Sequence, residues 1–372
     1  MFMAKKIIVI NTRVKPTYGG EEWTTQQIAE MLDKHYDVTY IGYPFNIKCK
    51  KKVFPFTEFL VKFPIKKGLG RLMRAIPITK IFFIKKLALK CDLLITNSDY
   101  DDIVIFRGGK ENIQYKKVLV VKHSANARFE KAYPDKLLKE RKFSIVVLNK
   151  ADGVVLSEKY GKKNISVIPT GMEFHRFPTG KLPQNWSIPT DRPTILSIGR
   201  LGEKQKGFSF GIRAIEECKK RDNRFFYVIA GEGPDRTRYE QLIKKLGLEQ
   251  DVKLLGRVSD AEKYTLLKLA DVVLIPSKEE SLGLVMVEAL NAGKVLLTTK
   301  TDGSVETIIE GRNGFFVKRD PVDIAIKLTE IFNLKGGGLD RIKRNAITTA
   351  KKYDFAKMMA SYRILINKIL EE

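Results

Sequence analysis

The chain has 372 residues, which suits two domains of ordinary size rather than a single core. Its 44% hydrophobic and 30% charged residues are typical of a globular protein, and no apolar run reaches the roughly 18 residues of a spanning helix. The formal net charge of +25 indicates an anionic partner, while three widely spaced cysteines argue against a disulfide framework and favour a reducing cytoplasm.

Short β-branched runs alternate with segments of helical periodicity along the chain. In the first half such runs occupy residues 5–12, 37–42, 92–96, 118–121, 144–148, 154–156 and 165–168. In the second half they occupy residues 193–199, 226–230, 252–255, 272–275, 295–298 and 315–317. Short apolar strands that alternate with helices are typical of parallel sheets covered on both faces. We therefore expect an α/β fold of two tandem Rossmann-like domains, which face each other across a cleft at the carboxyl ends of their strands.

The positive charge is concentrated in residues 48–90, where thirteen lysines and arginines stand against the single acidic residue Glu58. Phenylalanines and leucines interleave with these cations, and prolines divide the segment into short amphipathic pieces. Such pieces suit interfacial membrane binding, to which each cation near an anionic leaflet adds roughly 1 kcal/mol. We expect contact with a membrane surface, or with a substrate held there, through Lys50, Lys51, Lys52, Lys66, Lys67, Arg71, Arg74, Lys85 and Lys86.

An alternative for the same segment is an ordinary pair of helices whose apolar face packs within the first domain. A polyanion such as RNA could use the same charge. No nucleic-acid motif accompanies that charge, so we expect no nucleic-acid partner.

A stretch rich in proline and polar residues at 181–193 is typical of a linker between domains. We therefore assign residues 1–180 to a first domain and residues 181–350 to a second. The last segment, residues 351–372, carries apolar residues at helical spacing. It predicts a helix that packs back towards the first domain.

The strongest candidate site is the stretch SKEESLGLVMVEALNAG at residues 277–293, which follows the apolar run at 272–275. The pattern predicts a strand, a turn and a helix that opens near Leu284. The first turn of a helix leaves backbone N–H groups unpaired at its positive end, which suits a diphosphate. Gly283 allows close approach of the backbone, and the amides of Leu284 and Val285 would point at phosphate oxygens.

Two glutamates in this stretch, Glu280 and Glu288, are separated by eight positions. At helical rise this places them roughly 12 Å apart, whereas the carboxylate pairs of hydrolases are about 5–9.5 Å apart. We interpret the two side chains as clamps on opposite ends of one ligand rather than as a pair that shuttles a proton. The plainer alternative is an acidic helix cap followed by a surface glutamate.

A second candidate site is IGRLGEKQKGF at residues 198–208, which follows the first strand of the second domain. The guanidinium of Arg200 can hold a phosphate with two hydrogen bonds, and the ammonium of Lys206 adds a mobile point charge. Both would stabilise the negative charge that develops on a departing diphosphate, which is where transfer from a nucleotide-sugar requires charge stabilisation. The alternative is a solvated basic loop.

These motifs together resemble the C-terminal domain of the retaining glycosyltransferases of family 4, the group 1 enzymes with the two-Rossmann GT-B architecture. The matching residues are Gly199-Arg200-Leu201, Lys206-Gly207, Ala230-Gly231-Glu232-Gly233-Pro234, Leu255-Gly256-Arg257-Val258, Glu280 to Glu288, Thr301-Asp302-Gly303 with Glu306, and Asn313-Gly314. Their order and spacing fit most of residues 145–350. The first half matches sparsely, at Gly19-Gly20, His123 and Ala151-Asp152.

The resemblance implies a role for each matched position. Arg200 and Lys206 would bind the donor diphosphate, Glu280 would contact the transferred sugar, and Glu288 would bind the ribose hydroxyls. The implied donor site comprises Gly19, Gly20, Arg200, Lys206, Val258, Glu280, Gly283, Leu284, Val285 and Glu288. The implied catalytic group comprises His123, Arg200, Lys206 and Glu280. A purely structural role is the alternative for His123.

The resemblance also implies transfer of a sugar from a UDP- or GDP-type nucleotide-sugar, with retention at the anomeric carbon and without a metal or another cofactor. We expect a lipid-linked or membrane-anchored glycan as the acceptor, in the synthesis of cell-surface polysaccharide or glycolipid. The expected location is cytoplasmic, peripheral on the inner face of the cell membrane. Three alternatives stay open: a soluble glycosyltransferase with a small sugar acceptor, a sugar-nucleotide epimerase of the same fold, and a non-catalytic protein that binds anionic surfaces.

Overall fold

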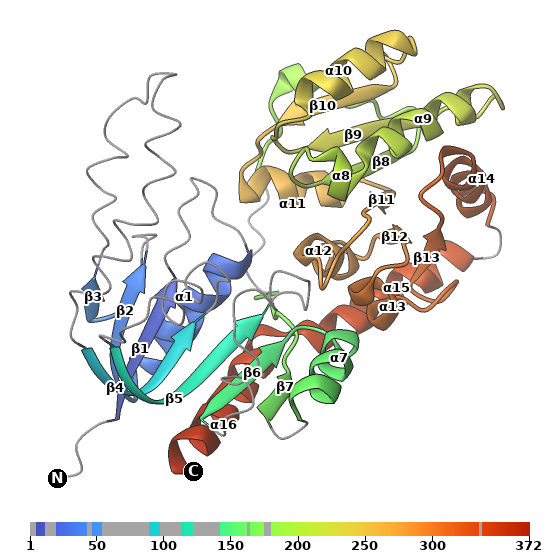
Figure 1. Ribbon diagram of the computed structural model, residues 1–372. Coiled ribbons are helices and arrows are strands. Elements are labelled where there is room, and N and C mark those ends of the chain that lie inside the picture. The colour runs from blue at the N-terminus through green and yellow to red at the C-terminus, as the bar shows by residue number, and fades with distance from the viewer. Residues whose placement is uncertain are drawn as a thin grey trace. The chain divides into compact units, whose positions relative to one another are not determined.

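The chain folds into two compact units, each built around a sheet (Figure 1). Unit 1 comprises Met1–Pro169 and Met358–Glu372, and unit 2 comprises Thr170–Lys357. The computed structural model describes residues 5–11, 20–42, 47–53, 89–96, 113–122, 142–161, 164–174, 180–334 and 337–372. Unit 2 begins at Thr170, so the domain boundary that we expected at residue 180 lies inside this unit.

Unit 1 contains a seven-stranded sheet whose described pairings are all parallel. The strands are β1 (Lys6–Asn11), β2 (Asp37–Gly42), β3 (Lys51–Val53), β4 (Leu89–Thr96), β5 (Ile113–Lys122), β6 (Phe143–Val147) and β7 (Ile165–Val167). They lie in the order β3-β2-β1-β4-β5-β6-β7, which is that of a doubly wound sheet. The described helices of this unit are α1 (Gly20–Leu32), α7 (Lys150–Tyr160) and α16 (Phe355–Glu371), and α16 begins in unit 2.

Unit 2 contains a six-stranded parallel sheet in the order β10-β9-β8-β11-β12-β13. The strands are β8 (Thr194–Ile198), β9 (Phe226–Ala230), β10 (Val252–Gly256), β11 (Val272–Ile275), β12 (Val295–Thr299) and β13 (Gly314–Val317). The helices are α8 (Glu203–Lys206), α9 (Phe208–Lys219), α10 (Arg236–Lys245), α11 (Asp260–Leu269), α12 (Leu284–Asn291), α13 (Asp302–Thr307), α14 (Pro321–Phe332) and α15 (Gly338–Ala350). Short 3-10 turns occupy Gln184–Trp186 and Lys351–Tyr353.

Helices bury apolar side chains on both faces of the unit 2 sheet. One core cluster joins Ile212 of α9 and Leu328 of α14 to inward-facing strand residues such as Leu274. A separate cluster joins helical residues such as Met286 of α12 to strand residues such as Val273. Continuous apolar strands are stable only when both faces are covered in this way, which explains the short β-branched runs in the sequence. The expected α/β fold with two Rossmann-like parallel sheets is confirmed.

The strand order of unit 2 reverses at β8, which lies between β9 and β11. Chain connections leave in opposite directions on the two sides of such a switch point, so a crevice forms outside the carboxyl ends of the central strands. The loops after β8 and β11 are therefore the place in this unit where a ligand is expected.

The apolar run at 154–156 is not a strand, because it lies within α7. Asn149 caps this helix by accepting a hydrogen bond from the backbone N–H of Asp152 at 2.7 Å. Val154 and Val155 are 56% and 55% exposed, whereas Leu156 is buried at 3%, so only one residue of the run faces the core. An apolar run of three residues does not distinguish a strand from one turn of helix.

The segment expected to be a linker packs on unit 2. Trp186 and Ile188 lie against the core cluster that includes Leu266 and Met286. The backbone N–H of Gly180 donates to Thr265 Oγ1 at 3.0 Å. Proline and polar residues here mark an irregular segment that is nevertheless anchored by its apolar side chains.

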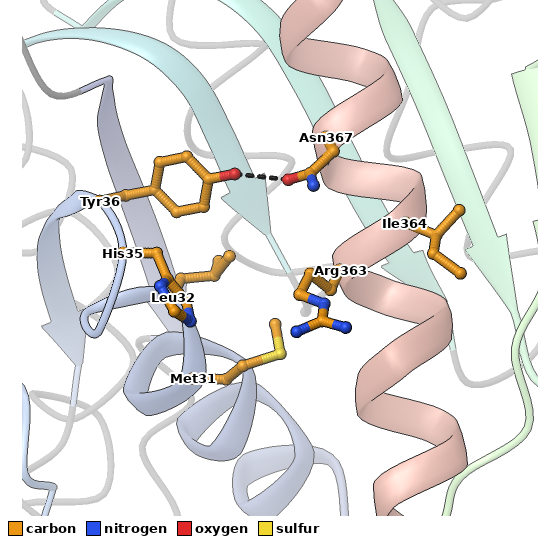
Figure 2. Close-up of a pocket in the computed structure, with 7 residues that line it drawn as sticks. All are labelled: Met31, Leu32, His35, Tyr36, Arg363, Ile364 and Asn367. Atoms are coloured by element: carbon orange, nitrogen blue, oxygen red, sulfur yellow. Dashed lines mark hydrogen bonds between the residues drawn. The ribbon is translucent and has the colours of Figure 1, made fainter. Parts of the chain in front are cut away.

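The C-terminal helix α16 buries Met358, Met359, Tyr362, Ile366 and Ile369, which is the apolar stripe expected from the sequence. Next to it in unit 1 is a cavity of about 520 Å³ between α16 and the end of α1 (Figure 2). Its lining residues are Met31, Leu32, His35, Tyr36, Arg363, Ile364 and Asn367. The Tyr36 hydroxyl hydrogen-bonds Asn367 Oδ1 at 2.5 Å across it. None of the site residues expected from the sequence lines this cavity.

Several expected site residues lie outside the described residues: Gly19, Lys66, Lys67, Arg71, Arg74, Lys85, Lys86 and His123. Within the described part of the chain, no helix combines the length and apolar character needed to cross a membrane.

Candidate functional site

The candidate site of unit 2 is built from loops that follow neighbouring parallel strands. Arg200 and Lys206 follow β8, and Glu280 follows β11, which pairs with β8. Because parallel strands end at the same edge of a sheet, these loops meet at the switch point of the sheet. Residues that lie far apart in the sequence thus converge at one edge.

The Glu280 carboxylate is the centre of this edge. Its Oε1 forms an ion pair with Lys206 Nζ and accepts a hydrogen bond from Ser277 Oγ at 2.9 Å. Its side chain is only 12% exposed, so the pair is partly shielded from water. Oε2 accepts no hydrogen bond from a described residue. The carboxylate therefore has one oxygen fixed by the protein and one available to a ligand hydroxyl.

The backbone around Glu280 is fixed by the loop after β12. The Gly303 N–H donates to the Glu280 carbonyl oxygen at 2.9 Å. A Cβ on Gly303 would lie 2.3 Å from the Ser281 carbonyl oxygen, so only glycine allows this approach. This explains why a Thr-Asp-Gly motif accompanies the Glu280 motif in the sequence: it positions the Glu280 loop.

Lys206 is positioned by Arg319, a residue that sequence analysis missed. Lys206 ends the short helix α8, and Gly207 follows in the left-handed region at φ 64°. The Arg319 guanidinium donates to the Glu203 carbonyl oxygen at 2.7 Å and to the Pro276 carbonyl oxygen at 3.2 Å. It thereby joins α8 to the end of β11. No local pattern signals this role, because Arg319 follows β13 and its partners are distant in sequence.

The loss of this link gives a first prediction. We expect Arg319→Met to lower the free energy of unfolding by about 1–3 kcal/mol, because two partly buried carbonyl groups lose a charged donor. Urea unfolding of the full chain measures this loss. Arg312→Met is the matched control, since Arg312 is exposed and its side chain forms no ion pair with a described residue. Equal unfolding midpoints for the two variants would contradict the assignment.

The loop that carries Arg200 rests on the glycines that follow β9. The Leu201 N–H donates to the Glu232 carbonyl oxygen at 3.0 Å. A Cβ on Gly231 would lie 1.8 Å from the Gly199 carbonyl oxygen, and one on Gly233 would lie 2.3 Å from that of Leu201. The Ala-Gly-Glu-Gly-Pro motif is therefore a support for this loop. The exposed Arg200 side chain forms no ion pair with another described residue, which leaves its guanidinium available to an anion.

Helix α12 begins at Leu284, as the sequence predicted, with Gly283 at its N-cap. The Gly283 carbonyl oxygen accepts from the Met286 N–H at 2.9 Å, and no side chain caps the helix. The amides of Leu284 and Val285 precede this first helical bond, so they are the unpaired donors that an anion can bind.

The Glu288 carboxylate lies inside the second turn of α12 and is 6% exposed. Its Oε1 accepts from Lys263 Nζ at 2.7 Å and from the Tyr264 hydroxyl at 3.4 Å, and both donors belong to α11. Burial alone would lower the pKa of Lys263, but the nearby Glu288 carboxylate raises it above its usual value. Lys263 belongs to none of the motifs seen in the sequence. Val258 is half-buried and packs on the same core cluster as Tyr264.

The structure thus brings together Arg200, Lys206, Glu280 and the α12 N-terminus on one unit. In unit 1, Gly20 begins α1. Lys50, Lys51 and Lys52 are exposed, and their ammonium groups contact oxygens of Asp33, Asp37 and Ile47. Their expected contact with a membrane or an acceptor stays a prediction.

The motif region of the chain matches a known family. Residues 179–352 match the family described as glycosyl transferases group 1. Residues 179–352 are thus similar to the group 1 glycosyltransferases, over just under half of the chain. The resemblance noted in the sequence is thereby confirmed, whereas the retaining mechanism of family 4 stays a prediction.

Two proteins to which the chain is similar come from bacteria. The chain is 33% identical over 127 residues to alpha-D-kanosaminyltransferase of Streptomyces kanamyceticus, a match that covers 34% of this chain and 33% of that protein. It is 24% identical to an uncharacterized glycosyltransferase of Haemophilus influenzae over 95% of both chains. The match to the first of these relatives therefore spans only a third of its length.

A solved structure resembles the whole fold. The structure of Alr3699/HepE from Anabaena, described as a complex with UDP-glucose, superposes with a TM-score of 0.73. The superposition covers 98% of this chain and all of that chain, at 19% sequence identity. Similarity at this identity shows the fold alone, and it extends beyond residues 179–352 to both units.

Proposed function

We propose that the chain is a glycosyltransferase that binds a nucleotide diphosphate-sugar at the carboxyl edge of the unit 2 sheet and moves the sugar to an acceptor. The observation that carries this proposal is the convergence of a cation pair, a half-free carboxylate and the uncapped start of α12 at one switch point. The cations and the start of α12 suit the diphosphate of the donor, and the carboxylate suits its sugar.

The diphosphate is the part that needs most charge stabilisation, because it leaves with a developing negative charge. The amides of Leu284 and Val285, the Arg200 guanidinium and the Lys206 ammonium supply donors and positive charge. Donor binding would draw Lys206 from Glu280 towards the phosphate oxygens. We propose that these groups suffice without a metal or another cofactor, and that the sugar is transferred with retention, as in the enzymes that the chain resembles.

The sugar and ribose ends are assigned to the two glutamates. Glu280 Oε2 is available to a hydroxyl of the transferred sugar. Glu288 is proposed to bind the ribose hydroxyls, and Val258 is proposed to lie near the base. Gly19, Gly20 and His123 of unit 1 complete the proposed donor and catalytic residues by resemblance alone.

For the acceptor we propose a lipid-linked or membrane-anchored glycan, recognised by unit 1 on the cytoplasmic face of a membrane. The support is the concentration of cations and aromatic residues in residues 48–90. A basic, amphipathic segment gains affinity for an anionic leaflet from both its charge and its apolar area.

Vesicle binding tests the membrane part. We expect replacement of Lys66, Lys67, Arg71, Arg74, Lys85 and Lys86 by glutamine to weaken co-sedimentation with phosphatidylglycerol vesicles at least about a hundredfold, since each cation adds roughly 1 kcal/mol. The matched control replaces six exposed cations of unit 2: Arg213, Arg238, Lys244, Lys245, Arg312 and Lys318. Equal vesicle binding by the two variants would contradict membrane contact and favour a small soluble acceptor.

Incubation of the full chain with a lipid-linked glycan acceptor and a panel of UDP- and GDP-sugars tests the activity itself. Formation of a new glycoside together with free nucleotide supports transfer. Release of nucleotide without a new glycoside would instead favour the epimerase, and no reaction with any donor would favour a non-catalytic binding protein.

A further inference from the structure

The contact between α11 and α12 contains a buried ion pair that none of the motifs explains. Glu288 lies on α12 and Lys263 on α11, and their side chains are 7% and 18% exposed. Removing two charges from water is costly, and the cost is repaid only by close pairing with further hydrogen bonds. A buried ion pair is therefore weak evidence for a stabilising role, and the presence of this pair is better explained by another function.

We propose that Lys263 is a positioning residue of the donor site, which fixes the Glu288 carboxylate so that a single oxygen is presented to the ribose hydroxyls. This inference rests on the proposed function, because it concerns the ribose end of the same donor.

The hydrogen bonds of Glu288 are one-sided. Lys263 Nζ at 2.7 Å and the Tyr264 hydroxyl at 3.4 Å both reach Oε1. Oε2 accepts no hydrogen bond from a described residue. An ionised carboxylate accepts on both oxygens and donates on neither. Oε2 is therefore matched to a ligand that donates, such as the adjacent hydroxyls of a ribose.

Lys263 is itself fixed in place. Its ammonium lies 3.1 Å from Asp260 Oδ1, one turn earlier in α11, and 4.7 Å from the centre of the Tyr264 ring. These contacts limit the rotamers of a side chain that is otherwise flexible. A fixed cation holds the Glu288 carboxylate in one orientation.

Without Lys263, the carboxylate would be buried and unpaired. It would then rotate towards water, and Oε2 would no longer be a fixed acceptor. Removal of Lys263 should therefore weaken the binding of ligands that carry ribose hydroxyls and leave the binding of ligands that lack them unchanged.

The experiment is calorimetric titration of the full chain with UDP and GDP, and with their 2′,3′-dideoxy analogues. We expect Lys263→Met to weaken binding of the ribonucleotide about tenfold or more, which is the usual size for a charged hydrogen bond. Binding of the dideoxy analogue should match that of the wild type. Lys263→Arg, which keeps the charge, should recover part of the affinity.

Two further variants sharpen the test. Glu288→Gln alone and Glu288→Gln with Lys263→Met should bind equally, because Lys263 acts only through Glu288 and coupled residues are not additive. Lys268→Met is the matched control, as an exposed cation on the same helix, and should bind like the wild type. Thermal unfolding of each variant separates loss of fold from loss of binding.

Three results would overturn the inference. Wild-type affinity of Lys263→Met for the ribonucleotide would show that Glu288 does not need Lys263. Equal weakening of the ribonucleotide and the dideoxy analogue would show that Lys263 contacts another part of the nucleotide or only stabilises unit 2. Failure of the wild type to bind any nucleotide would overturn the proposed function as well.

Discussion

Replacement of Glu280 by glutamine is expected to lower the rate of sugar transfer about 10²–10³-fold, the usual loss when a group that stabilises the transition state is removed. In this structure Glu280 Oε1 is bound by Lys206 and Ser277, and Oε2 accepts from no described residue. An amide of the same shape keeps the packing but loses the charge that binds Lys206. Nucleotide binding should not weaken in this variant, because Lys206 no longer divides its charge between a carboxylate and the diphosphate.

The two expectations are measured separately. Consumption of a UDP- or GDP-sugar under single-turnover conditions reports the transfer step, and titration with UDP or GDP reports nucleotide affinity. The neighbouring Glu279→Gln is the matched control, because the Glu279 side chain is 75% exposed and its ion pair with Lys278 is long, at 4.0 Å. Full transfer activity of Glu280→Gln would show that this carboxylate does not contact the sugar. A parallel loss of nucleotide affinity would indicate that Glu280 contributes to binding of the diphosphate, through its ion pair with Lys206.

A single methyl group on Gly303 is expected to have an effect of similar size by a different route. A Cβ there would lie 2.3 Å from the Ser281 carbonyl oxygen and 2.6 Å from its carbonyl carbon, so the backbone must move. Overpacking of this kind costs about 1–3 kcal/mol of unfolding free energy. The Gly303 N–H would then lose its hydrogen bond to the Glu280 carbonyl oxygen, and a shift of about 1 Å in a positioned group can lower the rate about 10²-fold.

Gly338→Ala is the control for Gly303→Ala. Both glycines lie in the first turn of a helix, but the nearest atom to a Cβ on Gly338 is 3.7 Å away, which is ordinary contact. Alanine in such a position is neutral or stabilising by up to about 1 kcal/mol. Transfer activity and urea unfolding, measured on both variants, check the prediction. A Gly303→Ala protein with wild-type stability and activity would mean that the Glu280 loop tolerates displacement.

The strand and helix order of unit 2 could be predicted from the sequence because each element has its own local pattern. The apolar run at 272–275 and the glycine before Leu284 sufficed to place the start of α12. The strand predicted at residues 154–156 was wrong, because three apolar residues fit one helical turn as well as a strand. The cap at Asn149 was the decisive signal, and it is a polar residue outside the run.

The pairings within the site could not be predicted in the same way. Lys206 and Glu280 are 74 positions apart, and Arg319 reaches Glu203 over 116 positions. Such contacts depend on which strands are neighbours, not on any local spacing. Lys263 carried no signal of its own, since a lysine on an amphipathic helix ordinarily faces water. The glycines at 231 and 303 were recognised only as motif members, whereas the structure gives the backbone approach that requires them.

The edge of the unit 2 sheet is proposed to bind a nucleotide-sugar whose sugar is then transferred. Mass spectrometry of the products tests this proposal most directly, with the full chain, a UDP- or GDP-sugar and a lipid-linked glycan acceptor, for the wild type and for Lys206→Met. We expect one new glycoside and an equal amount of free nucleotide from the wild type, with at least about tenfold less of both from Lys206→Met. Equal amounts of glycoside from both proteins, or nucleotide release without any glycoside, would contradict the proposal.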